Sequence, residues 1–169
     1  MIVTKEMHNK ELQAQYKQFK TVVAINKRKW GLKIMDSLVR LTKGQKVKGV
    51  INETHQVPSS HIKNQKIRTI ALRPEGTALE TLPAMVYFHG GGYMMGIPEM
   101  ANTFYKDILK RRKVAIFSPD YRVSTKDPFP AGFNDCYDVL IWVRDNAKKL
   151  NIDANKIIIA GHSGGGGMA

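Results

Sequence analysis

The sequence predicts an α/β protein with a mostly parallel sheet, and three observations lead to this prediction. From residue 66 onward, short apolar runs alternate with segments whose apolar residues recur at helical spacing. The apolar runs are continuous, as they are in strands that helices cover on both faces. Glycine and proline residues lie at the ends of many runs, where the chain must turn. This alternation favours parallel strands that are joined by helices.

The individual elements can be placed from these patterns. Strands are expected over residues 66–72, 84–88, 114–117 and 156–160, and helices over residues 102–112 and 133–150. Three consecutive isoleucines, Ile157 to Ile159, make the last strand the most apolar, as is typical of a strand that is buried on both faces and paired along both edges. Residues 43–66 are polar and contain Gly44, Gly49 and Pro58, which indicates a loop with short strands.

Residues 1–50 form a basic segment that differs from the rest of the chain. Residues 1–68 hold 15 of the 27 Lys and Arg residues but only 4 of the 14 Asp and Glu residues. Apolar residues recur in this segment mostly at three- and four-residue steps, which predicts one amphipathic helix or two helices broken near Gly31. The apolar positions are Leu12, Tyr16, Phe19, Val23, Trp30, Ile34, Leu38 and Leu41.

Composition and length exclude several classes of protein. The chain has 169 residues, 43% of them hydrophobic, which is enough to bury a core. It has no apolar run of the ~18 residues that a membrane-spanning helix needs, and its first residues do not resemble a secretory signal. A single cysteine, Cys136, excludes an internal disulfide and indicates a reducing compartment, so a cytoplasmic protein is expected. There is no zinc-ligand spacing and no phosphate-binding loop, so no metal or cofactor is expected.

The stretch Gly161-His162-Ser163-Gly164-Gly165 fits the pattern G-x-S-x-G directly after the last predicted strand. In serine hydrolases this pattern is a sharp strand-to-helix turn that presents the serine hydroxyl as a nucleophile. By itself the pattern is a weak signal, because glycine and serine are common in ordinary turns. The strand before it and the glycine-rich helix start after it favour Ser163 as a catalytic nucleophile.

A second glycine-rich stretch, His89-Gly90-Gly91-Gly92-Tyr93, follows the strand predicted at residues 84–88. Such a stretch is compatible with a flexible turn. It also suits an oxyanion hole, because glycines let backbone N–H groups point at the charge that develops on an attacked carbonyl oxygen. A strand followed by H-G-G-G, with a G-x-S-x-G turn two strands later, is the arrangement of lipases and esterases. The two stretches together predict a hydrolase.

Four stretches, LPAMVYFHGGGY, DYR, PFPAGFNDC and NIDANKIIIAGHSGGG, resemble the hormone-sensitive-lipase-like branch of the α/β hydrolases, a family of esterases and lipases. The resemblance covers residues 83–169 and implies an α/β-hydrolase fold. It implies that residues 51–169 are the N-terminal part of the hydrolase domain and that residues 1–50 are a basic helical cap segment. A small-molecule carboxylic ester is the implied substrate.

The resemblance also implies roles for individual residues. Ser163 matches the nucleophile that forms the acyl-enzyme. The backbone N–H groups of Gly91, Gly92 and Gly164 match the oxyanion hole. His89 matches the histidine that orients the glycine loop and transfers no catalytic proton.

Other positions match the family structurally or depart from it. Arg122 and Asp135 match residues that brace the top of the sheet. Residues 123–126, Val-Ser-Thr-Lys, stand where a stretch like Leu-Ala-Pro-Glu is usual. Gly164 stands where alanine is common, and only its backbone N–H is needed there.

The acid and the histidine of the triad follow the serine in this fold, whereas five small residues and Met168 follow Ser163 here. His162 adjoins the serine but leaves the turn in another direction, and His89 belongs to the glycine loop. The other three histidines lie in the basic N-terminal part. We therefore expect the sequence to be the N-terminal portion of an esterase, truncated just after the elbow and inactive by itself. The resemblance implies further strands that would then be missing, so the strand at residues 157–160 is expected to have an unpaired apolar edge.

An alternative from a different class is a non-catalytic binding protein. Its basic amphipathic N-terminal helix would bind an anionic surface such as a membrane. Nucleic acid is not an expected partner, because no recognition motif accompanies the positive charge. The sequence does not determine the oligomeric state.

Overall fold

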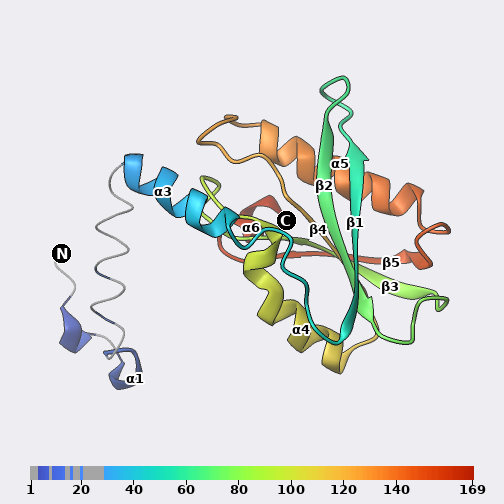
Figure 1. Ribbon diagram of the computed structural model, residues 1–169, viewed down its shortest axis with the longest axis horizontal. Helices are drawn as coiled ribbons and strands as arrows, with labels where there is room; N and C mark the ends of the chain where they lie inside the picture. The colour runs from blue at the N-terminus through green and yellow to red at the C-terminus, as the bar shows by residue number, and fades with distance from the viewer. Residues whose placement is uncertain (1–3, 8, 14–15, 17–19, 21–28) are drawn as a thin grey trace.

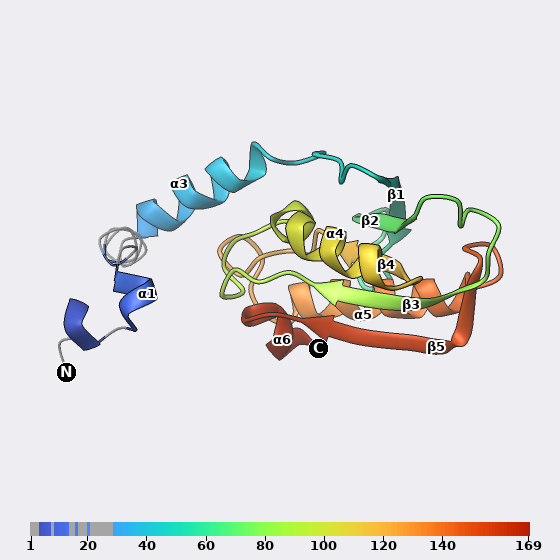
Figure 2. The ribbon, with the colours of Figure 1, turned by 90° about the horizontal axis from the view of Figure 1, so that it is seen from below.

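The computed structural model of the chain describes residues 4–7, 9–13, 16, 20 and 29–169. In its N-terminal part it has a short 3₁₀ helix, η1 (Lys5–Met7), and the helices α1 (Lys10–Gln13) and α3 (Lys29–Arg40). Gly31 lies inside α3 and does not break it. The predicted apolar positions Phe19 and Val23 lie outside the described residues. Figure 2 shows α3 at the end of the molecule from which the N-terminal part extends.

Five strands form one mixed sheet in the order β1-β2-β4-β3-β5. The strands are β1 (Val50–Pro58), β2 (Lys66–Pro74), β3 (Leu82–Phe88), β4 (Ala115–Pro119) and β5 (Ile152–Gly161). β3 pairs in parallel with both β4 and β5, whereas β2 pairs antiparallel with β1 and with β4. The carboxyl ends of β3, β4 and β5 therefore meet at one edge of the sheet, where ligands bind in open α/β sheets.

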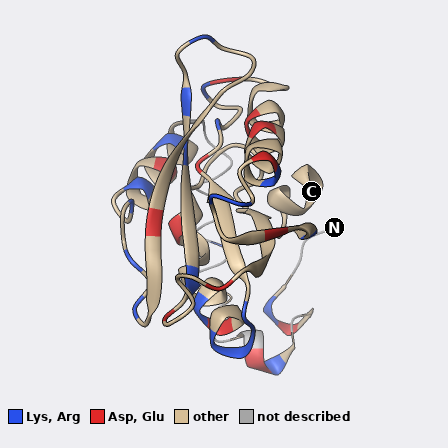
Figure 3. Ribbon diagram, turned by 90° about the vertical axis from the view of Figure 1, so that its right-hand side faces the viewer, with Lys and Arg blue, Asp and Glu red and all other residues tan. Residues whose placement is uncertain are grey.

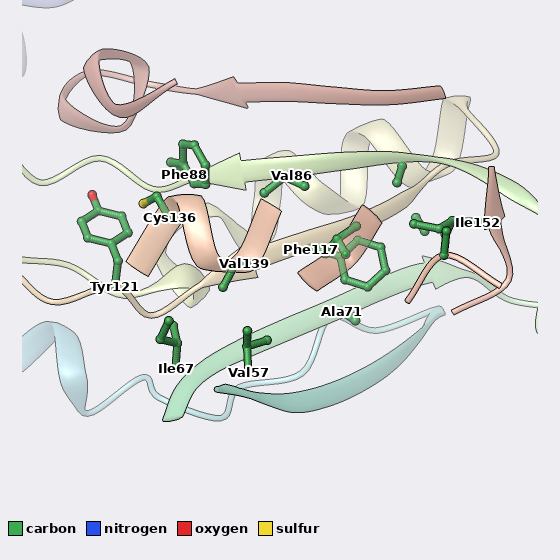
Figure 4. Packing of buried hydrophobic residues seen from close by; sticks show 14 of the residues in the cluster. Val57, Ile67, Ala71, Val86, Phe88, Phe117, Tyr121, Cys136, Val139 and Ile152 are labelled. Atoms are coloured by element: carbon green, nitrogen blue, oxygen red, sulfur yellow. The ribbon is translucent and has the colours of Figure 1, made fainter. Parts of the chain in front are cut away.

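Helices cover both faces of this sheet, as the sequence predicts. The connection from β3 to β4 contains η2 (Pro98–Ala101) and α4 (Asn102–Arg111), and that from β4 to β5 contains α5 (Ala131–Asp145). Neighbouring residues of β3 point to opposite faces, so Val86 packs with Val139 of α5, and Met85 packs with Tyr105 of α4. Figure 1 shows α4 and α5 on opposite sides of the sheet, and Figure 4 shows the core on the α5 side. Cys136 is buried in that core.

Strand β1 is longer than the short strands expected in the polar segment. It pairs with β2 over its whole length, from Val50 opposite Pro74 to Pro58 opposite Lys66. Its sequence, VINETHQVP, is rich in polar residues because β1 lies at the edge of the sheet and only Val57 is fully buried. Helix α5 ends at Asp145 rather than at residue 150, and residues 146–150 form turns.

The expected unpaired apolar edge at residues 157–160 is confirmed. β5 pairs with β3 alone and lies at the edge of the sheet. The side chains of Ile158 and Ile159 are 56% and 43% exposed, and among the described strands only β3 pairs with β5. Apolarity of the sequence indicated this strand correctly.

The exposed edge of β5 leads us to expect self-association of the 169-residue chain. Unpaired backbone groups beside exposed isoleucines are a template for pairing with another chain. Ile158→Lys is expected to lower the associated fraction in a concentration series measured by light scattering after size exclusion, because a charge on an edge strand opposes pairing. The matched control is Ile62→Lys, which replaces an isoleucine that is 42% exposed in the turn between β1 and β2. An equal effect of both variants would contradict the assignment of association to β5.

Candidate active site

A strained turn at Ser163 connects β5 to the short helix α6 (Gly164–Met168). The backbone of Ser163 has φ 51° and ψ −124°, a conformation that residues other than glycine rarely adopt. Strain of this kind persists only where the surrounding structure enforces it, and it is the local geometry of a nucleophile elbow. Ser163 is exposed at the carboxyl edge of the parallel strands.

Close packing of backbone on backbone enforces this turn. A β-carbon on Gly165 would lie 2.0 Å from the carbonyl oxygen of Phe88, at the end of β3. A β-carbon on Gly161 would lie 2.3 Å from the carbonyl oxygen of Gly165. Both contacts are far shorter than van der Waals distance, so β3, β5 and α6 approach one another only with glycine at these two positions.

The glycine loop after β3, residues 89–96, folds back on itself beside the elbow. The N–H groups of Met94 and Met95 both donate hydrogen bonds to the carbonyl oxygen of Gly91, at 3.1 and 3.2 Å. Gly91 has φ 131°, and a β-carbon there would lie 1.8 Å from the carbonyl oxygen of Met95. The loop is therefore a tight ring of backbone that requires glycine at position 91.

The ring lies directly over the start of α6, so two segments that are distant in sequence meet here. A β-carbon on Gly164 would lie 3.1 Å from the backbone nitrogen of Gly92 and 3.0 Å from that of Tyr93. The amide of Tyr93 is a potential donor that sequence reasoning missed. No sequence pattern could have indicated it, because the position of this amide depends on the left-handed backbone of Tyr93, with φ 64°.

His89 lies in the interior beneath the loop. Its side chain is completely buried, its ring stacks on Tyr121 at a centroid distance of 4.1 Å, and its Nδ1–H donates a 2.8 Å hydrogen bond to the carbonyl oxygen of Gly90. The hydroxyl of Tyr121 donates to the carbonyl oxygen of His89 at 2.6 Å. Burial lowers the pKa of His89 to about 4, so the ring is neutral near pH 7. These contacts fit a residue that holds the loop in place.

We expect the stability of the folded chain to fall as the pH falls from 6.5 to 4 because of His89. Over that range the unfolded chain binds a proton at this histidine, while the folded chain does not until about pH 4. The contribution of neutral His89 to the free energy of unfolding is therefore complete above pH 6.5. About 3 kcal/mol of the free energy of unfolding is lost by pH 4.

Urea unfolding at pH 7.5 and 4.5 tests this expectation. His89→Asn removes the titrating group, so the stability advantage of the unmodified chain over this variant should shrink by about 2–3 kcal/mol at the lower pH. His61→Asn, at an exposed position, is the control and should leave the pH dependence unchanged. A stability gap between the unmodified chain and His89→Asn that does not change with pH would contradict the assignment.

His162 is held away from the Ser163 hydroxyl. Its Nδ1 shares a hydrogen bond of 2.7 Å with the hydroxyl of Tyr87, and its ring stacks on that of Tyr87. The ring also lies against Gly90, where a β-carbon would be 2.6 Å from Nε2 of His162. Within the part of the chain that the structure describes, the Ser163 hydroxyl makes no hydrogen bond to a histidine. The described residues thus bring a serine and a loop of backbone donors together without a base.

Two polar contacts brace the loop that follows β4. The guanidinium of Arg122 makes a bidentate ion pair with Asp135 at the start of α5, with a shortest contact of 2.8 Å, and the backbone N–H of Arg122 donates to the same carboxylate. The hydrogen bond and charge of Asp135 raise the pKa of Arg122. Next along the chain, the N–H of Ser124 donates to the carbonyl oxygen of Tyr93. The loop after β4 is thereby fixed to both α5 and the glycine loop.

A cavity of about 400 Å³ adjoins the glycine loop and the end of α6. Aromatic and apolar side chains dominate its walls, as they do in small-molecule sites. They are contributed by Tyr93, Phe129, Phe133 and Met168.

No group of three or more His, Cys, Asp or Glu side chains among the described residues is placed to hold a metal ion. None of the described helices is long and apolar enough to span a membrane.

The sequence of residues 85–169 matches the family described as having the alpha/beta hydrolase fold. The chain belongs to this family, in its hormone-sensitive-lipase-like branch. This α/β hydrolase is 36% identical over 115 residues to an AB hydrolase superfamily protein of Schizosaccharomyces pombe, a match that covers 67% of the chain and 34% of that protein. It is 34% identical over 90 residues to carboxylesterase NlhH of Mycobacterium tuberculosis, a match that covers 53% of the chain and 28% of NlhH.

Solved structures agree with this assignment. A bacterial heroin esterase is similar with a TM-score of 0.71 at 26% identity, over 82% of this chain and 43% of that one. An ester hydrolase from the metagenome of Lake Arreo gives a TM-score of 0.73 at 27% identity, over 96% of this chain and 53% of that one. The α/β hydrolase described here thus spans about a third of the length of these curated relatives and about half of these solved structures.

Proposed function

We propose that this α/β hydrolase is the nucleophile-bearing part of a carboxylic-ester hydrolase. The observation that carries the proposal is the strained turn at Ser163, which lies against the glycine loop, with Gly164 packed beside the backbone nitrogen of Gly92. The names of the relatives, among them a carboxylesterase and an arylesterase, support ester hydrolysis as the reaction. The proposed substrate is a small-molecule carboxylic ester.

In the proposed mechanism, the Ser163 oxygen attacks the carbonyl carbon of the ester and loses its proton to a base. The oxyanion of the tetrahedral intermediate accepts hydrogen bonds from the backbone N–H groups of Gly91, Gly92 and Gly164. The intermediate expels the alcohol, which takes a proton from the protonated base, and leaves an acyl group on Ser163. Water then attacks the acyl-enzyme by the same path, releases the acid and restores the serine.

The base is the part of this mechanism that the described residues do not supply. His162 is hydrogen-bonded to Tyr87, and His89 is buried and neutral. His55 lies beside Phe117 and Trp142 on β1, at the opposite edge of the sheet from β5. A serine hydroxyl without a base is a weak nucleophile at neutral pH. We therefore propose that residues 1–169 are catalytically silent when no base is provided from elsewhere.

Residues 1–50 are proposed to act as a cap over the ester-binding cavity. Helix α3 and the turn that follows it carry exposed apolar side chains, which suit them to covering an apolar substrate. They are Trp30, Ile34 and Leu38 of α3 and Leu41 of the turn. The alternative of a non-catalytic protein that binds an anionic surface is not favoured, because the relatives are named as esterases. In addition, Lys and Arg are distributed over helices, strands and loops rather than confined to one element (Figure 3).

A chimera tests the proposed function. It joins residues 1–169 to the segment of Mycobacterium tuberculosis NlhH that follows the matched residues, which by the order of triad partners in this fold carries the acid and the histidine. Residues 1–169 alone should show no Ser163-dependent hydrolysis of p-nitrophenyl acetate, and the chimera should show it. A chimera that melts cooperatively but has no esterase activity would contradict the proposed reaction. Ser163-dependent turnover by residues 1–169 alone would contradict the proposed silence.

A further inference from the structure

One carboxylate on helix α3 reaches the glycine loop. Asp36 is only 5% exposed, although it belongs to a helix whose other side chains are largely in solvent. Its Oδ1 accepts a hydrogen bond from the backbone N–H of Gly96, the last residue of the glycine loop, at 3.3 Å. Its Oδ2 accepts one from Nε of Arg40, one turn along α3, at 2.9 Å.

A third contact joins Asp36 to the loop after β4. Nζ of Lys126 lies 3.6 Å from Oδ2 of Asp36. A glutamate here would place a second carboxylate beside Asp36, whereas the lysine places a compensating charge there. Lys126 thus links the loop after β4 to the carboxylate on α3.

Asp36 is held as a carboxylate by these neighbours. Burial acts to raise the pKa of Asp36, but the hydrogen bonds from Arg40 and Gly96 and the charges of Arg40 and Lys126 outweigh it. The net effect is a pKa below the ordinary value, so the group is charged at neutral pH. A charged acceptor makes a stronger hydrogen bond to a backbone N–H than a neutral one does.

A second set of ion pairs fixes the end of α3 and the segment after it. Asp120, at the end of β4, accepts contacts from Lys43 at 3.0 Å and from Arg68 at 3.1 Å. Arg68 also makes a bidentate pair with Glu99, and Glu99 accepts a hydrogen bond from the backbone N–H of Gly44. Arg40 also lies 3.8 Å from Asp120, so the two sets of ion pairs share Arg40. The contacts of Lys43 and Gly44 anchor the segment after α3 without Asp36.

We propose that Asp36 is a positioning residue that links helix α3, the glycine loop and the loop after β4, and so fixes the backbone donors of the oxyanion hole. This inference rests on the proposed function for its catalytic meaning. The ring of residues 89–96 is closed at one end by β3, and at the other end Asp36 binds the N–H of Gly96. Without the carboxylate, Gly96 loses this hydrogen bond and the glycine loop becomes more mobile. The backbone N–H groups of Gly91 and Gly92 then move away from the positions in which they bind the oxyanion.

Hydrogen exchange of residues 1–169, measured by mass spectrometry of peptides, tests the link without any need for catalysis. Asp36→Ala is expected to raise the exchange rate of the peptide spanning residues 89–96 by about tenfold, the scale of one hydrogen bond to a charged group. Asp36→Asn keeps an oxygen acceptor for Gly96 and should restore exchange to within about threefold of the unmodified chain. Lys126→Glu should raise exchange in the same peptide, since it sets two carboxylates against each other.

The neighbouring exposed residue provides the matched control. Ser37→Ala, whose hydroxyl bonds only within α3, should leave exchange in residues 89–96 unchanged. Peptides from β2 and α5 report on global stability, so a merely structural role would raise exchange in them as well. Unchanged exchange of residues 89–96 in Asp36→Ala and in Lys126→Glu, or an increase shared equally by β2 and α5, would overturn the proposal. Because no outcome depends on Ser163, failure here is distinct from failure of the esterase chimera.

Discussion

Ser163→Ala in the NlhH chimera is expected to abolish hydrolysis of p-nitrophenyl acetate, with a loss on the order of 10⁶ in kcat. Without the Ser163 oxygen there is no attacking atom and no acyl-enzyme. The remaining structure, with its glycine loop and cavity, still binds the ester, so KM should change much less than kcat. Initial rates over a range of substrate concentrations measure both parameters.

Two controls make this result interpretable. Intact-mass analysis after brief exposure to p-nitrophenyl acetate should show an acetyl group on the chimera with Ser163 and none on the variant. His162→Ala, next to the nucleophile, should retain a substantial part of the activity, because its ring is bonded to Tyr87 and transfers no proton in the proposed mechanism. More than about a tenth of the activity in Ser163→Ala would remove this serine from the mechanism.

Gly91→Ala is expected to lower kcat of the chimera by about 10² to 10³, the scale of an oxyanion donor that is displaced. The added β-carbon would lie 1.8 Å from the carbonyl oxygen of Met95, so the ring of the glycine loop must open. The backbone of Gly91 also has a φ of 131°, which alanine adopts only with strain.

Gly92→Ala is the matched control for this prediction. Its β-carbon would meet only Met94, at 3.6 Å, and its φ of 60° lies in the left-handed region that alanine can occupy at modest cost. The N–H of residue 92 is kept, so activity should fall far less than in Gly91→Ala. Thermal melting must show that both variants are folded. Equal activity of the two variants would mean that the backbone N–H groups of the glycine loop stabilise the oxyanion equally well without glycine at position 91.

The sequence predicted those parts of the fold that depend on local patterns. Apolar runs located β2, β3, β4 and β5, and helical spacing located α4 and most of α5, because burial on one or both faces imposes those periods. Strand β1 was underestimated since its edge position allows polar residues, as in Asn52, Glu53 and His55.

In the site, too, the sequence predicted what depends on local patterns and missed what depends on tertiary structure. Glycine patterns pointed to the turn at Ser163 and to the loop after β3, because only glycine permits such close backbone packing. The amide of Tyr93 and the carboxylate of Asp36 were not predicted. Both are brought to the loop by tertiary structure, Asp36 from a helix 60 residues away in sequence from Gly96. No local pattern of residues predicts a contact between residues that are so far apart in sequence.

The strand order also determines when the elbow can form during folding. β1 and β2 are joined by a short connection and can pair early, but β5 pairs with β3 across the whole segment between Phe88 and Ile152. Pairings that close long loops form late, because the entropy of closure must be overcome before any contact is gained. The strain at Ser163 is maintained by the contact of Gly165 with the end of β3, so it cannot exist before that pairing. In refolding experiments on the chimera we therefore expect esterase activity to return after the hairpin of β1 and β2 is protected from exchange.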